Sequence, residues 1–337
     1  NQEHMISGKA NPGGRILAQT VREMYADGQT DYSLEPVILT EDDGKPLGRK
    51  KDGDAVVFCC RRGEREIQLT EAFTDPNLTQ FPRKTFKNLP FVILTLYHDK
   101  FKDLPVAFAP ARVDETLGEL VCRAGKRQVR ISESEKFAHV TFFLNGGNPA
   151  SSGETGVRIP SPKGIPFDQV PELKLPEVAD KVIDALQDGI DLVVTNFANG
   201  DVIGHTANRE AKIKCAEVVD YQLGRVLEAA RKAGYVMLVT ADHGNLEELV
   251  SEDGTPHVAH TTNPVNCILI DPLSRNPLNL IDGKLADIAP TILQALKISS
   301  PQSMNGSSLV STHDFGQNRK VLLVILDGWG IGKQDES

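Results

Sequence analysis

Aspartate and histidine residues gather in four short motifs, and each motif follows or lies close to an apolar run typical of a buried strand. Because the carboxyl ends of parallel strands meet at one edge of a sheet, where open α/β sheets bind their ligands, we expect these side chains to converge. The motifs contain Asp201 and His205 (Asn-Gly-Asp-Val-Ile-Gly-His), Asp242 and His243 (Ala-Asp-His-Gly-Asn), His257 and His260 (Pro-His-Val-Ala-His), and Asp327 (Asp-Gly-Trp-Gly).

Carboxylates and imidazoles crowded at a buried strand end need a neutralising cation, since unpaired buried charges are strongly unfavourable. Carboxylate oxygens mixed with imidazole nitrogens suit Mn²⁺, Zn²⁺ or Co²⁺ better than a metal that prefers thiolates. Taken singly, an Asp after a strand can also be a helix N-cap, and His257 is better explained as a neighbour than as a ligand. The recurrence of the pattern after several strands favours a metal centre.

Composition limits the class of protein. The chain has 337 residues, of which 40% are apolar and 25% charged, with a formal net charge of −9. This charge argues against a general nucleic-acid binder, which needs a basic surface. No apolar run reaches the roughly 18–20 residues of a membrane span, and no signal peptide opens the sequence. We therefore expect a cytoplasmic protein that binds neither membrane nor nucleic acid. Separately from composition, we expect a small-molecule substrate and a monomer.

Short apolar runs alternate with amphipathic stretches, which predicts an α/β fold with a mainly parallel sheet covered by helices on both faces. The predicted strands are 55–59, 91–97, 128–131, 140–144, 191–196, 236–240, 266–270 and 320–326. The predicted helices are 14–26, 114–124, 176–187, 209–233 and 285–296.

A change in composition near residues 104–113 predicts a boundary between two domains. Residues 1–110 then form part of a smaller α/β domain, and residues 111–337 form the larger, metal-binding domain. Within the larger domain, the polar, turn-rich residues 311–320 are expected to form a loop. Residues 320–337 are expected to form a strand followed by a turn. The strand 321–326 has no polar face, so we expect it to be central in the sheet, with Asp327 beside Asp242.

The combined motifs resemble those of the cofactor-independent (2,3-bisphosphoglycerate-independent) phosphoglycerate mutases, a family of the alkaline phosphatase superfamily. The resemblance extends over residues 14–310 and again over 320–335. It implies an alkaline-phosphatase-like domain joined to part of a smaller transferase domain. It also implies a metal-dependent isomerase of glycolysis and gluconeogenesis that interconverts 3-phosphoglycerate and 2-phosphoglycerate through a phosphoserine, without 2,3-bisphosphoglycerate.

The resemblance also implies roles for individual residues. Two divalent ions are expected, Mn²⁺ first, with Mg²⁺ or Co²⁺ as alternatives. Substrate binding is expected from Arg62 and Arg65 of the Phe-Cys-Cys-Arg-Arg-Gly-Glu-Arg segment, whose forked side chains suit phosphate and carboxylate. Lys136 is expected to bind substrate and to act in catalysis by contacting the transferring phosphoryl group. The implied ligands of one ion are Asp201, His205 and His260, and those of the other are Asp242, His243 and Asp327.

The sequence departs from the family pattern in two ways. The strand with Asp-Gly-Trp-Gly opens the family sequence but here follows the other motifs, which indicates either a circular permutation or segments joined out of family order. The family's nucleophilic Ser, in Gly-Asn-Ser-Glu-Val-Gly-His, has no counterpart, and Ser251 and Ser337 lie in unrelated contexts. Two alternatives to a mutase therefore stay open: a metal-dependent phosphohydrolase of the same superfamily, and a non-catalytic protein that binds metal and phosphoglycerate.

Overall fold

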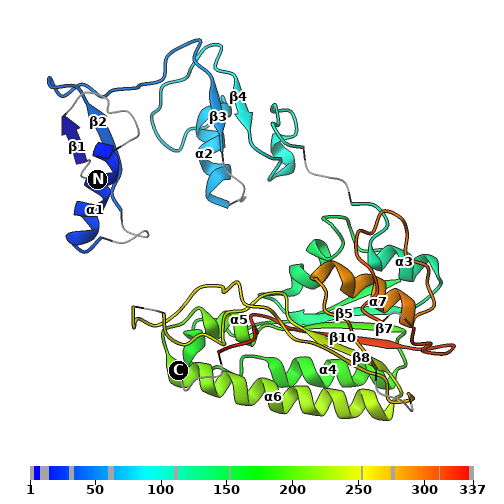
Figure 1. Cartoon of the computed structure of the whole chain (residues 1–337). Coiled ribbons are helices and arrows are strands. Elements are labelled where there is room, and N and C mark those ends of the chain that lie inside the picture. Colours follow the sequence, from blue (N-terminus) through cyan, green and yellow to red (C-terminus); the bar gives the residue numbers. More distant parts are fainter. Residues whose placement is uncertain are drawn as a thin grey trace. The chain divides into compact units, whose positions relative to one another are not determined.

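The computed structural model divides into two compact units, Asn1–Ala111 and Arg112–Ser337 (Figure 1). It describes residues 4–7, 15–29, 34–59, 64–109, 113–151, 153–251, 253–274, 278–310 and 312–333, with the backbone alone at 4–7, 15, 64 and 65. Among these residues, no helix is both long and apolar enough to cross a membrane. The predicted roles of the two domains remain predictions.

The smaller unit contains two short parallel strand pairs. Strand β1 (His4–Ser7) pairs with β2 (Val37–Thr40), and β3 (Val56–Phe58) pairs with β4 (Phe91–Ile93). Its helices are α1 (Arg15–Ala26), α2 (Glu64–Thr74) and the 3₁₀ turn η1 (Asp99–Phe101). A small core of Phe91, Ile93 and Phe101 lies around the β3–β4 pair.

The larger unit is built on a six-stranded sheet of order β6-β5-β7-β10-β8-β9. All neighbouring pairs are parallel except β8 and β9 at one edge. The strands are β5 (Gln128–Glu133), β6 (Glu154–Ile159), β7 (Leu192–Phe197), β8 (Val236–Thr240), β9 (Cys267–Ile270) and β10 (Val321–Leu326). Strand β10 pairs with both β7 and β8, which confirms that this apolar strand is central although it follows the others in sequence.

Helices cover both faces of this sheet, which confirms the predicted α/β class (Figure 1). Helices α4 (Leu175–Gln187) and α6 (Arg209–Lys232) pack on one face, and α3 (Leu117–Arg123) and α7 (Ile288–Ala295) on the other. The remaining elements are α5 (Asn199–Gly204) and the short helices η2 (His139–Phe143), η3 (Phe167–Gln169) and η4 (Leu285–Asp287).

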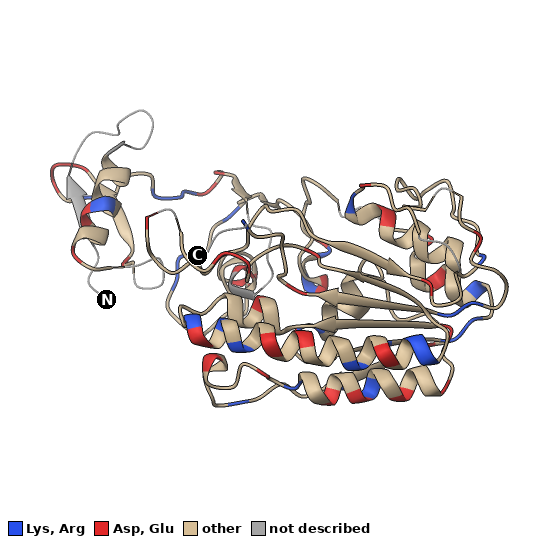
Figure 2. Cartoon of the chain, turned by 60° about the horizontal axis from the view of Figure 1, so that its bottom comes forward, with Lys and Arg blue, Asp and Glu red and all other residues tan. Residues whose placement is uncertain are grey.

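The sequence of α6 explains where this helix begins and ends and which of its faces points outward. The side chain of Asn208 caps the first turn by accepting a hydrogen bond from the Ala211 backbone N–H at 3.1 Å. Gly234, with φ of +74°, follows the last turn in a conformation that favours glycine. Figure 2 shows Lys, Arg, Asp and Glu interspersed along the outer faces of α4 and α6. An ion pair between Arg225 of α6 and Asp180 of α4, at 2.7 Å, joins the two helices.

The prediction of a strand at 140–144 is wrong, because residues His139–Phe143 form a π-helical turn. The run Val-Thr-Phe-Phe-Leu has high strand propensity, but its burial follows a helical period rather than alternation. Val140 is buried, whereas Phe142 and Phe143 are exposed. Strands β1, β2 and β6 and helix α2 were absent from the predicted elements, and the predicted strand 91–97 is shortened to Phe91–Ile93.

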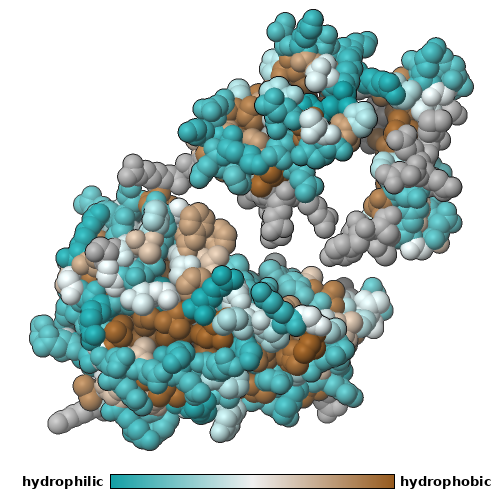
Figure 3. Space-filling view, turned by 180° about the vertical axis from the view of Figure 1, so that it is seen from behind, coloured by the Kyte–Doolittle hydropathy of each residue, from teal (hydrophilic) through white to brown (hydrophobic). Residues whose placement is uncertain are grey.

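The larger unit also leaves apolar surface uncovered. Figure 3 shows a band of apolar side chains on the rear of this unit, bordered by polar ones. A hollow of about 580 Å³ between β5, β6 and α4 is lined by Val129, Ile131, Val157 and Ala185 among others.

Candidate metal centre

Four parallel strands end at the same edge of the sheet, and the motifs lie just beyond them. Asp327 directly follows β10, and its backbone N–H continues the pairing with β7 by donating to Phe197 O at 3.2 Å. Asp201 lies in the first turn of α5 after β7, Asp242 follows β8, and Lys136 follows β5. The sheet therefore brings together side chains that are far apart in the sequence, as the motifs predicted.

Two glycines allow the turn after β10 to touch α5. A Cβ atom at Gly200 would lie 2.4 Å from the backbone oxygen of Asp327, and one at Gly328 would lie 2.6 Å from the Asp201 backbone nitrogen. Gly328 also has φ of +73°, a conformation that side chains rarely adopt. Without side chains at these positions, the backbones carrying Asp201 and Asp327 can approach closely enough for both carboxylates to share one site.

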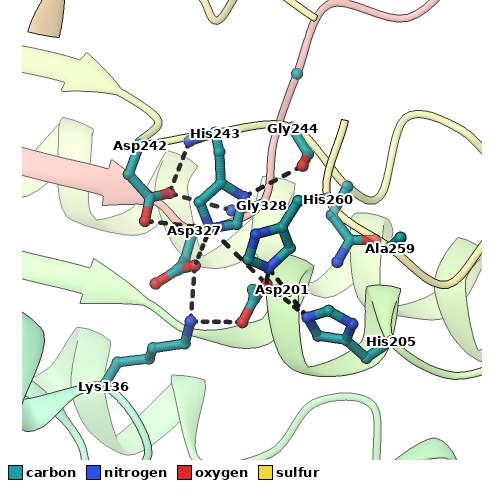
Figure 4. Close-up of polar contacts among 12 residues, drawn as sticks. Lys136, Asp201, His205, Asp242, His243, Gly244, Ala259, His260, Asp327 and Gly328 are labelled. Carbon is teal, nitrogen blue, oxygen red and sulfur yellow. Dashed lines mark hydrogen bonds and ion pairs between the residues drawn. The ribbon is translucent and has the colours of Figure 1, made fainter. Parts of the chain in front are cut away.

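One oxygen of Asp201 is surrounded by imidazoles (Figure 4). Its Oδ1 lies 2.9 Å from His260 Nε2, 3.1 Å from His205 Nε2 and 3.9 Å from His243 Nε2. The two nitrogens His205 Nε2 and His260 Nε2 are themselves 3.1 Å apart. Nitrogen and oxygen lone-pair atoms from separate loops thus face one another, which is the arrangement of ligands around a shared cation.

Lys136 links the two buried carboxylates. Its ammonium donates to Asp201 Oδ2 at 2.5 Å and to Asp327 Oδ1 at 3.0 Å. Asp327 is fully buried, and its second oxygen accepts a hydrogen bond from Asn196 Nδ2 at 2.6 Å. Together with Asp242, these carboxylates place more negative charge in the site than the single ammonium of Lys136 neutralises, and such a site attracts a divalent cation.

The pKa shifts reflect this excess of negative charge. Burial, followed by repulsion from Asp242, raises the pKa of Asp327 despite the attraction of Lys136. Burial also acts to raise the pKa of Asp201, but the hydrogen bond and the charge of Lys136 outweigh it, so that this pKa is lowered. Burial acts to lower the pKa of Lys136, and the charges of Asp327 and Asp201 raise it instead. Lys136 therefore stays protonated at neutral pH.

His243 and Asp242 complete the site from the loop after β8. His243 Nε2 lies 3.4 Å from Asp242 Oδ2 and 3.6 Å from Asp327 Oδ1. Its ring packs against that of His260, with ring centroids 3.9 Å apart. A cavity of about 900 Å³ opens beside Asp242 and His243 and is lined also by Asn263, Asp282 and Lys284 among polar residues.

The side chains form two sets of ligand atoms, each compact enough to hold one metal ion. One set is Asp201, His205 and His260, and the other is Asp201, His243 and Asp327, with the ligand atoms of each set within 4.8 Å of one another. The first set coincides with the grouping that the resemblance implies. The second set contains Asp201, whereas the resemblance implies Asp242 in its place. Asp201 therefore belongs to both sets of ligand atoms. The ligand roles themselves remain predictions, but mixed carboxylate and imidazole donors fit Mn²⁺, Co²⁺ or Zn²⁺.

A backbone carbonyl orients His205, one of the predicted ligands. His205 Nδ1 lies 2.8 Å from Val258 O, so this nitrogen donates and Nε2 is left to face Asp201. The preceding carbonyl, His257 O, accepts a hydrogen bond from Lys212 Nζ at 2.5 Å. His257 Nε2 lies 2.9 Å from Ala259 O, and His257 belongs to neither set of ligand atoms, consistent with a neighbouring rather than a ligating role.

The sequence interpretation did not identify several residues that support the site. Asn196 holds Asp327, Lys212 holds the loop before His260, and the carboxylate of Glu247 bonds to three loops around the site. Glu247 lies in the same Asp-His-Gly-Asn-Leu-Glu segment as two predicted ligands, so its position after β8 was a usable signal. Apart from the bond between Asn245 and Glu247, the hydrogen bonds that define these roles join residues at least 14 positions apart and have no sequence signature.

The predicted substrate arginines belong to the smaller unit. Arg62 lies outside the described residues, and only the backbone of Arg65, in α2, is described. Their roles remain predictions. Of the serines considered as substitutes for the family nucleophile, Ser337 is outside the described residues, and the Oγ of Ser251 lies 3.4 Å from His257 Nδ1.

Comparisons with known proteins agree with the motifs. The model of the Metalloenzyme superfamily matches residues 26–300. A 2,3-bisphosphoglycerate-independent phosphoglycerate mutase 2 from Methanosarcina acetivorans is 44% identical over 293 residues, covering 86% of this chain and 56% of the relative. The corresponding mutase from Syntrophotalea carbinolica is 44% identical over 297 residues, covering 87% and 57%.

A solved structure shows the same relationship. A Leishmania mexicana phosphoglycerate mutase, crystallised at low cobalt concentration, matches with a TM-score of 0.64 and 27% sequence identity. The match covers 88% of this chain and 58% of that chain. The chain thus spans a little over half the length of the relatives that it matches.

Proposed function

We propose that this chain, which belongs to the Metalloenzyme superfamily, forms the metal-binding part of a cofactor-independent phosphoglycerate mutase that interconverts 3-phosphoglycerate and 2-phosphoglycerate. The observation that carries the proposal is the pair of ligand sets that meet at Asp201. The names of the relatives and the resemblance of the motifs support the choice of substrate. In this proposal Asp201, His205, His260, His243 and Asp327 hold two divalent ions, with Asp242 beside them.

Bound divalent ions at such a site polarise phosphoryl oxygens and lower the pKa of a nucleophilic hydroxyl. The residues of the chain supply the remaining needs of phosphoryl transfer. Lys136 directs its ammonium to the point between Asp201 and Asp327, where it can also stabilise negative charge on the phosphoryl oxygens. The proposed role of Arg62 and Arg65 is to bind the carboxylate and phosphate of the substrate through paired hydrogen bonds.

The test of this function is metal binding followed by substrate binding. Calorimetric titration of chelator-treated protein with Mn²⁺ should give two ions per chain. Titration of the metal-loaded protein with 3-phosphoglycerate should then show binding that Lys136→Met weakens. Absence of Mn²⁺ binding would refute the metal centre, whereas Mn²⁺ binding without phosphoglycerate binding would refute only the substrate. Parallel titrations with Mg²⁺ and Co²⁺ would identify the preferred ion.

A second candidate function is a metal-dependent phosphohydrolase. The feature of the larger unit that favours this alternative is the exposure of His205 and His260, whose side chains are 46% and 50% exposed. An open site of the same chemistry releases phosphate to water rather than returning it to the substrate. Release of inorganic phosphate from a phosphomonoester, dependent on Mn²⁺ and abolished by Asp327→Asn, would support this function over the mutase.

The predictions about partners and location belong to the same proposal. We expect a small-molecule substrate, a monomer and a cytoplasmic location. Sedimentation equilibrium of the purified protein and fractionation of cells that produce it would check the last two. A dimer at micromolar concentration, or recovery in the membrane fraction, would contradict them.

A further inference from the structure

The carboxylate of Glu247 bonds to three separate loops at the metal centre. Its Oε2 accepts hydrogen bonds from the backbone N–H of Asn245 at 2.7 Å and of Gly330 at 3.0 Å. Its Oε1 accepts from the hydroxyl of Thr261 and from Asn263 Nδ2, the latter at 3.0 Å. A single side chain thus joins the loop after β8, the loop before β9 and the turn after β10.

Each of these loops carries a proposed metal ligand close to its bond with Glu247. Asn245 follows His243 by two residues, Thr261 directly follows His260, and Gly330 follows Asp327 by three. Glu247 belongs to neither set of ligand atoms. Its contacts lie on the backbone and side chains next to the ligands, which is how residues around a metal site fix the orientation of its ligands.

Glycines make room for this carboxylate. A Cβ atom at Gly244 would lie 2.1 Å from Glu247 Oε1, and one at Gly330 would lie 2.2 Å from the same oxygen. Any other residue at either position would push the carboxylate out of its place. The glycines in the segments Asp-His-Gly-Asn and Asp-Gly-Trp-Gly therefore leave space for the carboxylate of Glu247, in addition to any role in forming turns.

The hydrogen bonds also keep the side chain charged. Burial acts to raise the pKa of Glu247, but the bonds from Thr261, Asn263 and Gly330 outweigh it, so the pKa is lowered. The donors described above are neutral groups, and none of them is a Lys or Arg. The carboxylate therefore acts as an acceptor that several loops share, rather than as one half of an ion pair.

We propose that Glu247 is a positioning residue that holds the loops of His243, His260 and Asp327 in the arrangement needed for metal binding. The inference rests on the proposed metal centre. It predicts that Glu247 acts through hydrogen-bond geometry rather than through its charge. Gln tests this distinction, because its amide oxygen can accept both backbone N–H groups while its amide nitrogen donates to the hydroxyl of Thr261, which preserves three of the four contacts.

The experiment compares Glu247→Ala, Glu247→Gln and the matched control Glu248→Ala. Glu248 is the adjacent carboxylate, and it accepts a hydrogen bond from Asn263 Nδ2 at 3.0 Å. Circular dichroism of the metal-free proteins checks folding. Calorimetry with Mn²⁺ gives affinities, and the visible absorption of bound Co²⁺ reports the geometry of coordination. Because outer-shell residues typically change metal affinity about 10- to 100-fold, Glu247→Ala should fall in that range and alter the Co²⁺ spectrum.

Glu247→Gln should keep the affinity within about threefold of the wild type and retain its Co²⁺ spectrum, and Glu248→Ala should stay within about twofold, because both keep most contacts. A loss of Mn²⁺ affinity of tenfold or more in Glu247→Gln would overturn the positioning role and favour a role for the charge of Glu247. This test holds even if Glu247→Ala does not fold. Equal losses in Glu247→Ala and Glu248→Ala would also overturn it. Wild-type protein that binds neither ion would refute the proposed function together with this inference, whereas a wild-type affinity in Glu247→Ala would refute the inference alone.

Discussion

Asp201 is the residue whose replacement best separates the geometry of the site from the family assignment. The structure places it in both sets of ligand atoms, whereas the resemblance gives it to one ion only. Asp201→Asn removes its charge with little change in shape. If the geometry is right, this substitution weakens both metal sites, whereas His260→Ala, which removes a ligand atom from the first set only, leaves the second ion bound.

The expected magnitude follows from the number of ions lost. An ion present at about 100 times its dissociation constant stabilises the folded state by about 2.7 kcal/mol, so two independent ions contribute about 5.4 kcal/mol. Adding Mn²⁺ should therefore raise the free energy of unfolding by about 5 kcal/mol in the wild type. The rise should be about 2.7 kcal/mol in His260→Ala and close to zero in Asp201→Asn.

The assay is urea denaturation of each variant with chelator and again with Mn²⁺, accompanied by calorimetric stoichiometry. Taking the difference within one variant cancels the effect of the substitution on the metal-free protein, where Lys136 loses a partner. If Asp201→Asn retains one ion and about half of the metal-induced stabilisation, Asp201 serves one site only. That result would refute the shared-ligand geometry and favour Asp242 as a ligand of the second ion.

Four further predictions concern the fold, the pH dependence and the activity. Arg319→Met should lower the free energy of unfolding by roughly 1.5–3 kcal/mol, because the buried carboxylate of Asp271 loses its contact with Arg319 Nη2 at 2.5 Å and keeps those with His313 Nε2 and the Leu273 backbone N–H, each at 3.0 Å. Burial acts to raise the pKa of Asp271, but the hydrogen bonds from Arg319, His313 and Leu273 together outweigh it, so this pKa is lowered. The stabilisation that the carboxylate provides therefore holds above about pH 4 and is lost in more acidic solution, where urea denaturation should show a smaller difference between the variant and the wild type. Gly200→Ala should lower the free energy of unfolding by roughly 1–3 kcal/mol and weaken Mn²⁺ binding, because a Cβ atom would meet the backbone of Asp327; unchanged calorimetry and melting would contradict this. Mn²⁺ affinity should fall in acidic solution, since imidazole binds metal only when neutral, and equally tight binding at pH 5 and pH 8 would refute the ligand set. A protein of these 337 residues should bind 3-phosphoglycerate, more weakly after Arg62→Ala, yet show no turnover when coupled to enolase, because the family's serine motif is absent from the sequence.

The sequence predicted the parts of the fold that depend on local apolar pattern. Strand 236–240 was predicted with its observed bounds, and the helix observed at Arg209–Lys232 was predicted to within one residue. The central place of β10 followed from its lack of a polar face. The prediction failed at 140–144, where β-branched and aromatic residues favour a strand locally but the burial of Val140 requires a helical turn.

The sequence also predicted which residues would converge on the site, and the comparisons confirm the family resemblance. It could not predict that Asp201 lies between both sets of ligand atoms, because that depends on the contact of Gly200 with the turn after Asp327. Nor could it identify Asn196 as a supporting residue, since its partner Asp327 is distant in sequence. The position of Glu247 beside two predicted ligands was a usable signal, but its bonds to Thr261, Asn263 and Gly330 could not be predicted from the sequence. Sequence motifs indicate which side chains can donate ligand atoms, whereas the sharing of one ligand between two sets depends on how the chain packs.

The central position of β10 has a consequence for how the sheet assembles. Val321 pairs with Leu192 of β7 on one side and with Val236 of β8 on the other. The sheet therefore stays incomplete between β7 and β8 until β10, which is much later in the sequence, inserts between them. Until then both strands expose unpaired backbone N–H and C=O groups along one edge, next to apolar side chains, and such edges invite aggregation. Pairings so distant in sequence predict slow folding. A separately synthesised peptide containing β10 should therefore be able to complete the sheet of a chain that lacks it.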